Sequence, residues 1–177
     1  WGKNKEDYDF THWPETEQAA AQAYKMAGIT NPRRQLDVAE IHDCFSIAEL
    51  IAMEGLGFCE KGRARETLID SGATIAPQFR EEVMKRWGAT AAEIANCPAA
   101  EDILVVNHSG GLKSFGHPVG GSGGREIYEI YKQIQGKAKD PSRQLQGVRL
   151  GLAHNQGGHP GRFVCAVMIV GVPEERL

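Results

Sequence analysis

A glycine-rich stretch at residues 110–124 places one histidine, His117, between a glycine and a proline. Glycine lets the backbone turn tightly and approach a ligand closely, while proline fixes φ and stiffens the segment. General acid–base catalysis needs an imidazole that is held in position before its pKa matters. A stiffly held histidine on such a loop is therefore a candidate proton-transfer group, and the alternative is an ordinary histidine in a turn.

The other reactive side chains lie in two segments that each follow an apolar run typical of a strand. Residues 42–45 read His-Asp-Cys-Phe, and residues 154–158 read His-Asn-Gln-Gly-Gly. Cys44 lies near a predicted helix N-terminus, where the dipole favours the thiolate and lowers the thiol pKa. The glycines after Gln156 offer backbone N–H groups to a developing oxyanion. Because sites in α/β sheets form at strand ends, we expect the segments to meet.

Each of these side chains also has a purely structural interpretation. Cys44 alone could be a small buried apolar residue, and His42 a hydrogen-bonded histidine at the sheet edge. His154 and Asn155 could cap a turn. The remaining cysteines are assigned to packing, and no pair has the spacing of a zinc site or a disulfide framework. They are Cys59, Cys97 and Cys165.

The elements that must position these residues alternate between helices and apolar strands, which favours a layered α/β domain. A capping box of Ser46 and Glu49 predicts the start of a helix that ends at Gly55. Other helices are expected over 16–27, 79–87, 91–95 and 127–134, after an extended lead-in over 1–14. Strands are expected over 36–41, 103–106, 148–153 and 163–170, with the last two antiparallel.

Two of these elements carry a prediction about which side chains share a face. In the strand over 36–41, Leu36 and Val38 should lie on one face, with Ala39 and Ile41 on the other. In the helix over 127–134, the apolar face should consist of Ile127, Ile130, Tyr131 and Ile134.

Composition limits the class of protein. The chain has 177 residues, of which 41% are hydrophobic, so one domain with a real core is expected. A formal charge of −3 argues against a nucleic-acid binder. Neither a bilayer-length apolar run nor a signal-peptide pattern is present, and the unpaired cysteines favour a reducing cytoplasm. Because it begins with Trp1, we expect a fragment, a processed product or a natural subunit.

The motifs carry a resemblance to a known family. The string Asn-His-Ser-Gly-Gly, which begins at Asn107, and the following Gly-His-Pro-Val-Gly-Gly-Ser-Gly resemble the thiolase signature. His-Asp-Cys-Phe at 42–45 is similar to the block found in sterol-carrier-protein-type and archaeal-type thiolases. The resemblance implies that residues 1–177 form the C-terminal half of a thiolase-like layered αβαβα fold with a mixed sheet, and that the N-terminal half is absent.

The resemblance also implies site roles and a reaction. His117 would activate the nucleophilic cysteine, Cys44 would be the second acid or base, and His42 would contribute to the first oxyanion hole. The reaction would be CoA-dependent cleavage or condensation of a 3-oxoacyl-CoA, with CoA as co-substrate, no tightly bound cofactor and no metal. The second oxyanion hole would form at His154, Asn155, Gln156 and Gly157, through backbone at the last two.

The chain departs from the thiolase pattern in two ways. It lacks the N-terminal half with the nucleophilic cysteine, so it should be inactive alone and should join that half, in the same polypeptide or as another chain. Residues 73–102 are longer than the usual connection. The apolar face of this segment would cover a bulky acyl group, dock a second protein, or merely decorate the surface. That face consists of Phe79, Val83 and Trp87.

Partners and alternative functions follow from the same resemblance. An acyl-CoA substrate, a homo-oligomer and a small OB-fold, zinc-containing acyl-CoA-binding protein are the implied partners, without nucleic acid or membrane. The alternatives are a thiolase-fold aldolase, which is a carbon–carbon lyase acting on an acyl-CoA, and a non-catalytic thiolase-fold subunit.

Overall fold

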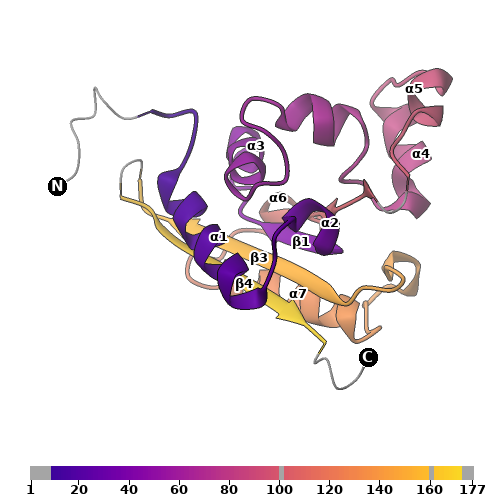
Figure 1. Cartoon of the computed structure of the whole chain (residues 1–177). Coiled ribbons are helices and arrows are strands. Elements are labelled where there is room, and N and C mark those ends of the chain that lie inside the picture. Colours follow the sequence, from indigo (N-terminus) through magenta and orange to yellow (C-terminus); the bar gives the residue numbers. More distant parts are fainter. Residues whose placement is uncertain (1–8, 100–101, 160–161, 173–177) are drawn as a thin grey trace.

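The computed structural model describes residues 9–99, 102–159 and 162–172 (Figure 1). A single mixed sheet has the strand order β2-β1-β3-β4. The strands are β1 (Val38–Ile41), β2 (Val105–Val106), β3 (Leu150–Gly157) and β4 (Val164–Gly171). β1 is parallel to both of its neighbours, whereas β3 and β4 are antiparallel. The predicted α/β class, the mixed sheet and the antiparallel closing pair are confirmed.

The register decides which side chains come to the same edge of the sheet. Val38 pairs with Val105 of β2 and with Gly151 of β3, so the carboxyl ends of these strands point the same way. Ile41, the last residue of β1, pairs with His154. β3 continues past this point because its pairing with β4 extends to Gly157. The prediction that His154 follows the strand is therefore wrong, since it lies within it.

Helices cover both faces of the sheet. α1 (Pro14–Ala27) lies across β4 on one face and contacts α3 (Ser46–Gly55), whereas α7 (Ser122–Ile134) packs on β3, β1 and β4 (Figure 1). The smaller elements are α2 (Pro32–Gln35), the π-helix η2 (Arg65–Asp70), α4 (Pro77–Arg86), α5 (Ala91–Ala95), α6 (Gly111–Phe115) and the 3-10 helix η4 (Pro141–Arg143). No helix among the residues just delimited is long and apolar enough to span a membrane.

Several predicted helices are present with the expected ends. α1 ends where expected, because Gly28 adopts φ 68° and donates its backbone N–H to Tyr24 O. α4 and α5 occupy the two helical stretches expected within 79–95. The predicted lead-in over 1–14 falls mostly on residues 1–8, which lie outside the described part, and helix α1 already begins at Pro14.

The prediction that Leu36 and Val38 share one face of the strand is wrong, whereas Ala39 and Ile41 do share a face. Leu36 packs in the same core as Ala39 and Ile41, whereas Val38 belongs to the core on the α7 side. Leu36 caps α2 and precedes the strand, so strand alternation does not extend to it.

The predicted capping box of α3 is absent. Ser46 is the first helical residue, and the N-cap, Phe45, makes no side-chain cap. Glu49 instead accepts a hydrogen bond from Asn107 Nδ2 at 2.9 Å, which commits its carboxylate to a tertiary contact. A capping box does form at Thr90 and Glu93 of α5.

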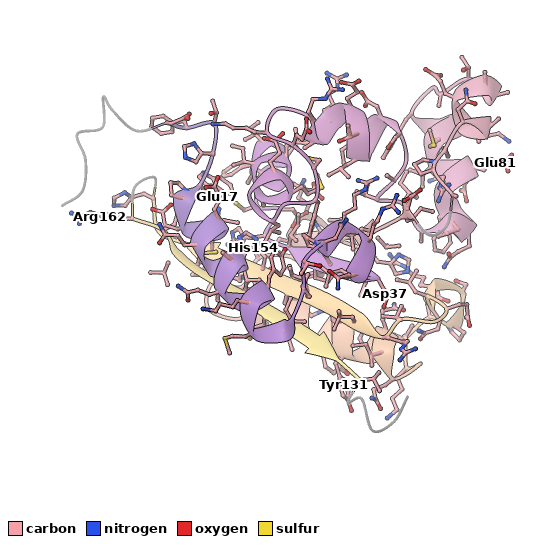
Figure 2. The ribbon with its side chains drawn as sticks, in the orientation of Figure 1. Glu17, Asp37, Glu81, Tyr131, His154 and Arg162 are labelled. Carbon is pink, nitrogen blue, oxygen red and sulfur yellow. The ribbon has the colours of Figure 1, made fainter. Side chains whose placement is uncertain are left out.

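The buried face of α7 is more polar than the sequence pattern indicates. Ile130 is fully buried, and a Cβ added at Gly151 would lie 2.5 Å from its Cγ2, so the helix approaches β3 closely. Tyr131, however, is 45% exposed at the outer side of the helix (Figure 2). Glu126 and Glu129 are buried in its place. The predicted apolar face is therefore correct at Ile130 and wrong at Tyr131.

Candidate active site

Two histidines from different segments meet beyond the end of β1. His42 directly follows the strand, and His117 lies in the loop between α6 and α7. Their rings are 4.9 Å apart between centroids and meet edge to face at 83°. His42 is only 4% exposed, while the side of the pair formed by His117 is open to solvent. The structure thus brings these two predicted site residues together.

The orientation of His117 follows from the first residue of α7. His117 Nδ1 lies 2.7 Å from the hydroxyl of Ser122, and that hydroxyl donates to Pro118 O at 3.4 Å. A hydroxyl that donates to a carbonyl accepts from the imidazole, so Nδ1 carries the proton and Nε2 is the basic nitrogen. Sequence reasoning missed the role of Ser122, although its position five residues after the histidine is part of the signature string.

His42 is a neutral imidazole at neutral pH. Burial lowers the pKa of His42, the neighbouring charge of His117 lowers it further, and Asp43 opposes both. Its Nδ1 is buried and has no hydrogen-bond partner among the residues that the structure describes. A buried polar atom without a partner is costly, so this nitrogen is a candidate for contact with a ligand.

Cys44 is half-buried and follows Asp43, two residues before the first residue of α3. The expected lowering of its thiol pKa is wrong: burial raises the pKa of Cys44, a hydrogen bond from the backbone of Phe45 opposes the shift, and the charge of Asp43 adds to it. Desolvation outweighs the effect of the helix terminus because the thiol is partly removed from water. Cys44 is consequently a protonated thiol at neutral pH.

Asp43 joins the segment after β1 to the glycine-rich signature. Its Oδ1 accepts a 2.6 Å hydrogen bond from the backbone N–H of Leu112, and Lys113 Nζ lies 3.7 Å from Oδ2. Gly111 has φ 63°, and a Cβ at that position would collide with the Asp43 carboxylate. A glycine is therefore required here for the signature backbone to reach the carboxylate.

Gly111→Ala should destabilise the protein by about 2 kcal/mol or more, because it adds a steric collision to a left-handed backbone. Gly120→Ala is the matched control, since Gly120 has φ 84° but nothing within 4 Å of the added Cβ. Urea unfolding measures both variants. Equal losses would show that Asp43 yields without cost and would contradict the expected difference.

Asn107 forms a second tie between the same segments. Its Oδ1 accepts from the backbone N–H of Ile41 at 2.8 Å, and its Nδ2 donates to Glu49. Asn107 has φ 49°, which asparagine tolerates better than most residues. Lys113 Nζ completes the network at 3.3 Å from Glu49 Oε2. These ties place the loops after β1 and β2 side by side, a role that sequence reasoning did not assign to Asn107 or Glu49.

The side chains of His154 and Gln156 do not reach the histidine pair. Both contact Thr16 of α1, whose hydroxyl lies 3.2 Å from His154 Nε2 and donates to Gln156 Oε1 at 3.2 Å. Figure 2 labels His154 at the sheet, next to α1. His154 is 0% exposed, and burial lowers its pKa to about 3. Its side chain is a neutral core group.

Asn155 and Gly157 extend beyond the end of β1 on the other side of β3. Asn155 Nδ2 donates to Glu126 Oε1 of α7 at 3.2 Å, and Gly157 is exposed. Because Ile41 pairs with His154, the residues that follow in β3 have no parallel partner in β1. Of the third predicted segment, the backbone after His154 is therefore the part that lies at the same end of the sheet as the residues that follow β1.

Two buried carboxyl groups beneath the site were missed by sequence reasoning. Glu40 of β1 accepts two hydrogen bonds from Ser109, at 3.0 Å from its N–H and 2.6 Å from its hydroxyl, and burial raises the pKa of Glu40 to about 7. Burial also raises the pKa of Glu126 to about 8, and the charges of Glu40 and Asp43 add to this. A charged residue within the apolar run 38–41 was the available signal for the first. Within the described ranges, no cluster of three or more His, Cys, Asp or Glu could hold a metal ion.

Comparisons with known proteins agree with this arrangement. A sequence profile described as "Thiolase C-terminal domain-like" matches residues 3–78 and 87–169. The chain is 35% identical over 153 residues to an acetyl-CoA acetyltransferase of Methanothermobacter thermautotrophicus, covering 86% of this chain and 32% of the relative. It is 33% identical over 159 residues to human sterol carrier protein 2, covering 90% of this chain and 24% of the relative.

A solved structure supports the fold. The chain superposes on an Ltp2-ChsH2(DUF35) aldolase with a TM-score of 0.60 and 21% identity, covering 96% of this chain and 35% of the other. It thus spans about a third or less of the length of these three proteins. The profile matches most of the chain, the site motifs lie within the matched residues, and the architecture is shared. This chain therefore belongs to the thiolase C-terminal domain-like family.

Proposed function

We propose that this chain is the C-terminal half of a thiolase-type acyltransferase that cleaves or forms 3-oxoacyl-CoA thioesters with CoA as co-substrate. The observation that carries the proposal is the edge-to-face pair of His42 and His117, with the Cys44 thiol in the same short segment as His42. The nucleophilic cysteine would come from an N-terminal half. Thioester exchange needs these parts: an activated thiol, a second proton donor and a group that stabilises an oxyanion.

In the cleavage direction, His117 Nε2 would take the proton of the nucleophilic thiol, and the thiolate would attack the 3-oxo carbonyl. The C2–C3 bond then breaks, which leaves an acyl-enzyme and an enolate of acetyl-CoA. Cys44 would protonate the enolate carbon, and its raised pKa makes it a thiol that still holds this proton. The thiol of CoA would then take the acyl group and return a proton to Cys44.

The oxyanion roles are divided between two segments. His42 is neutral, so it can donate a hydrogen bond to the thioester oxygen without adding a charge to the site. Backbone at Gln156 and Gly157 would bind the acyl-enzyme carbonyl, with Asn155 fixed by Glu126 beside it. The side chain of His154 has no part in this step, because it is committed to Thr16.

Exposed apolar side chains around the site support the proposal that an N-terminal half packs against this chain. Phe45 and Ile47 are 71% and 62% exposed, and Val119, next to the signature Pro118, is 90% exposed. On the edge strand β4, Val164 is 79% exposed. Exposed apolar groups concentrated at a site and along a sheet edge are typical of surfaces that another element covers. The same assignment implies an acyl-CoA substrate, a homo-oligomer, a cytoplasmic location and a small OB-fold zinc protein as partner.

The test uses the complete polypeptide or the two halves expressed together. A 3-oxoacyl-CoA should be cleaved only when CoA is present, and the products identified by mass spectrometry should be acetyl-CoA and the shortened acyl-CoA. This chain without its other half should release neither product. Cleavage of a hydroxyacyl-CoA without free CoA would instead identify the aldolase alternative. If neither substrate is cleaved, the result would favour the alternative of a non-catalytic thiolase-fold subunit.

A further inference from the structure

A cleft of about 710 Å³, whose lining includes neither His42 nor His117, lies between α4 and the edge strand β2. Phe79 and Val83 of α4, with Trp87 at its end, line one side, and Val105 and Val106 of β2 lie within it. Figure 1 shows α4 on the side of the molecule opposite α1. The volume falls within the range of small-molecule sites. The apolar wall formed by α4 and β2 is joined in the lining by polar and charged residues, among them Asp43, Lys113 and Asp140.

Aromatic rings contribute to the lining of the cleft. Trp87 is 56% exposed, and the ring of Phe79 lies 6.0 Å from that of His108 at an interplanar angle of 31°. Burial lowers the pKa of His108, and its Nε2 lies 2.6 Å from Arg143 O, so the imidazole is neutral and held in place. Flat, partly exposed rings favour an apolar ligand that itself contains a ring.

Lys113 and Arg143, which line the cleft, already contact other groups of the protein. Lys113 lies between the carboxylates of Asp43 and Glu49, and Arg143 donates to the backbone carbonyl of His108 at 2.7 Å. Asp140 adds a further negative charge to the lining. A phosphate-rich group needs cations that are available to it. The charge of the rim therefore favours an uncharged apolar group over the phosphates of CoA.

The apolar wall is joined to the core of the domain through Phe79, which packs against the buried cluster that includes Ala76 and Val105. Met84, on the inner side of α4, is 2% exposed, and the thiol of Cys97 lies 3.1 Å from its sulfur. Arg80 donates to Pro98 O at 2.9 Å, and Lys85 pairs with Glu81 on the outer side of the helix. A helix anchored on one side and charged on the other is a preformed wall, which argues against a loosely attached surface decoration.

The wall is also the segment that sets this chain apart from its family. The family profile passes over residues 79–86, which include Phe79 and Val83. The opposite side of the cleft includes Asp43 and Lys113, which belong to the two motif segments. The helix segment that the family profile does not match therefore lines the same cleft as residues of the family motifs.

We propose that this cleft binds the acyl portion of the substrate, and that the substrate class is acyl-CoA thioesters with a bulky, ring-bearing hydrocarbon acyl group. The assignment of the thioester as the reacting group rests on the proposed function, whereas the binding of the hydrocarbon is argued from the cleft alone. An acetyl group would leave most of the volume empty, so the wall adds affinity only for a large acyl group.

Binding of two unreactive CoA thioethers to the complete polypeptide tests the proposal. S-(3-phenylpropyl)-CoA and S-ethyl-CoA share every polar group and differ in the hydrocarbon, and neither has an acyl carbonyl to be attacked. Isothermal titration should give at least about tenfold tighter binding of the phenylpropyl compound. Val83→Lys should remove this preference and leave S-ethyl-CoA affinity within about twofold, which also shows that the variant is folded.

Glu82→Lys is the matched control, because it introduces the same side chain one position along α4, where Glu82 is exposed and pairs with Arg86. It should retain the preference. Equal affinities of the wild-type protein for the two thioethers, or equal effects of the two lysine variants, would overturn the proposal. If the preference depends on Val83 but the protein shows no thiolysis, the assignment of the cleft stands and the proposed function is refuted. If the protein shows thiolysis but no preference, the proposed function stands and the assignment of the cleft is refuted.

Discussion

Alanine in place of His117 should lower CoA-dependent thiolysis by the complete enzyme by about 10³-fold, the middle of the range for general acid–base groups. The loss is expected in kcat, since the role proposed for the imidazole is to take up a proton in the chemical step. Steady-state rates with saturating 3-oxoacyl-CoA and CoA measure it.

His12→Ala is the matched control for that change. His12 pairs with Asp9 at the surface, 3.0 Å from its carboxylate, and its loss should alter the rate by less than about twofold. Cys44→Ser should also reduce thiolysis strongly, because a hydroxyl is a much weaker acid than the thiol. Unchanged turnover in both His117→Ala and Cys44→Ser would exclude the assigned roles.

Glu126→Gln should remove about 2 kcal/mol of the pH dependence of stability between pH 6.5 and 8.5. Burial raises the pKa of Glu126 from 4.5 to about 8, so the folded protein holds a proton that the unfolded chain has already lost. Stability contributed by that proton is present in full below pH 4.5 and falls until the pH passes about 8. Glutamine is uncharged throughout and keeps an oxygen for Asn155. Urea unfolding at the two pH values measures the difference.

The chosen pH window excludes an opposing contribution. The pKa of His154 is lowered to about 3 by burial, so its folded form stays neutral while the unfolded chain takes up a proton below pH 6.5. Stability from His154 is thus complete above pH 6.5. Glu40, with its pKa raised to about 7, titrates mostly in the lower part of the window and remains in the variant. A slope that Glu126→Gln leaves unchanged would contradict the prediction.

Glu129→Gln provides the contrast, because Glu129 is equally part of the buried face of α7 but is paired. Its carboxylate lies 2.5 Å from Arg125 and 2.8 Å from Lys132. Neutralising it leaves two cations without their carboxylate, so this variant should lose stability at both pH values. A lost pH dependence in Glu126→Gln and a lower stability at both pH values in Glu129→Gln would distinguish a buried carboxyl without a cation from one that contacts two.

The sequence was sufficient for features that depend on local pattern. The helix that ends at Gly28, the short helix over 91–95 and the antiparallel closing strands follow from periodicity and from glycine at a left-handed position. The family resemblance rested on strings of residues whose spacing is specific, and the profile match confirms it. The segments that carry His42 and His117 were expected to meet because sites form at strand ends, and the structure brings the two imidazole rings together.

Features that depend on tertiary partners could not be read in the same way. Glu49 has the spacing of a capping box with Ser46, but Asn107, which is 58 residues away, takes its carboxylate. His154 has the composition of a loop residue, yet pairing with β4 keeps it in the strand and Thr16 takes its ring nitrogen. The pKa of Cys44 rises because desolvation exceeds the helix-terminus effect, and a sequence does not state how deeply a side chain is buried.

Three imidazoles, those of His117, His42 and His154, together disfavour the build-up of positive charge among themselves. His117 disfavours protonation of His42, and His42 disfavours protonation of His154. In the proposed mechanism, a proton taken up by His117 would hold His42 more firmly in its uncharged form, so the hydrogen-bond donor assigned to the oxyanion would keep the same charge. Of the three imidazoles, the solvent-exposed His117 would then be the one that takes up and releases a proton.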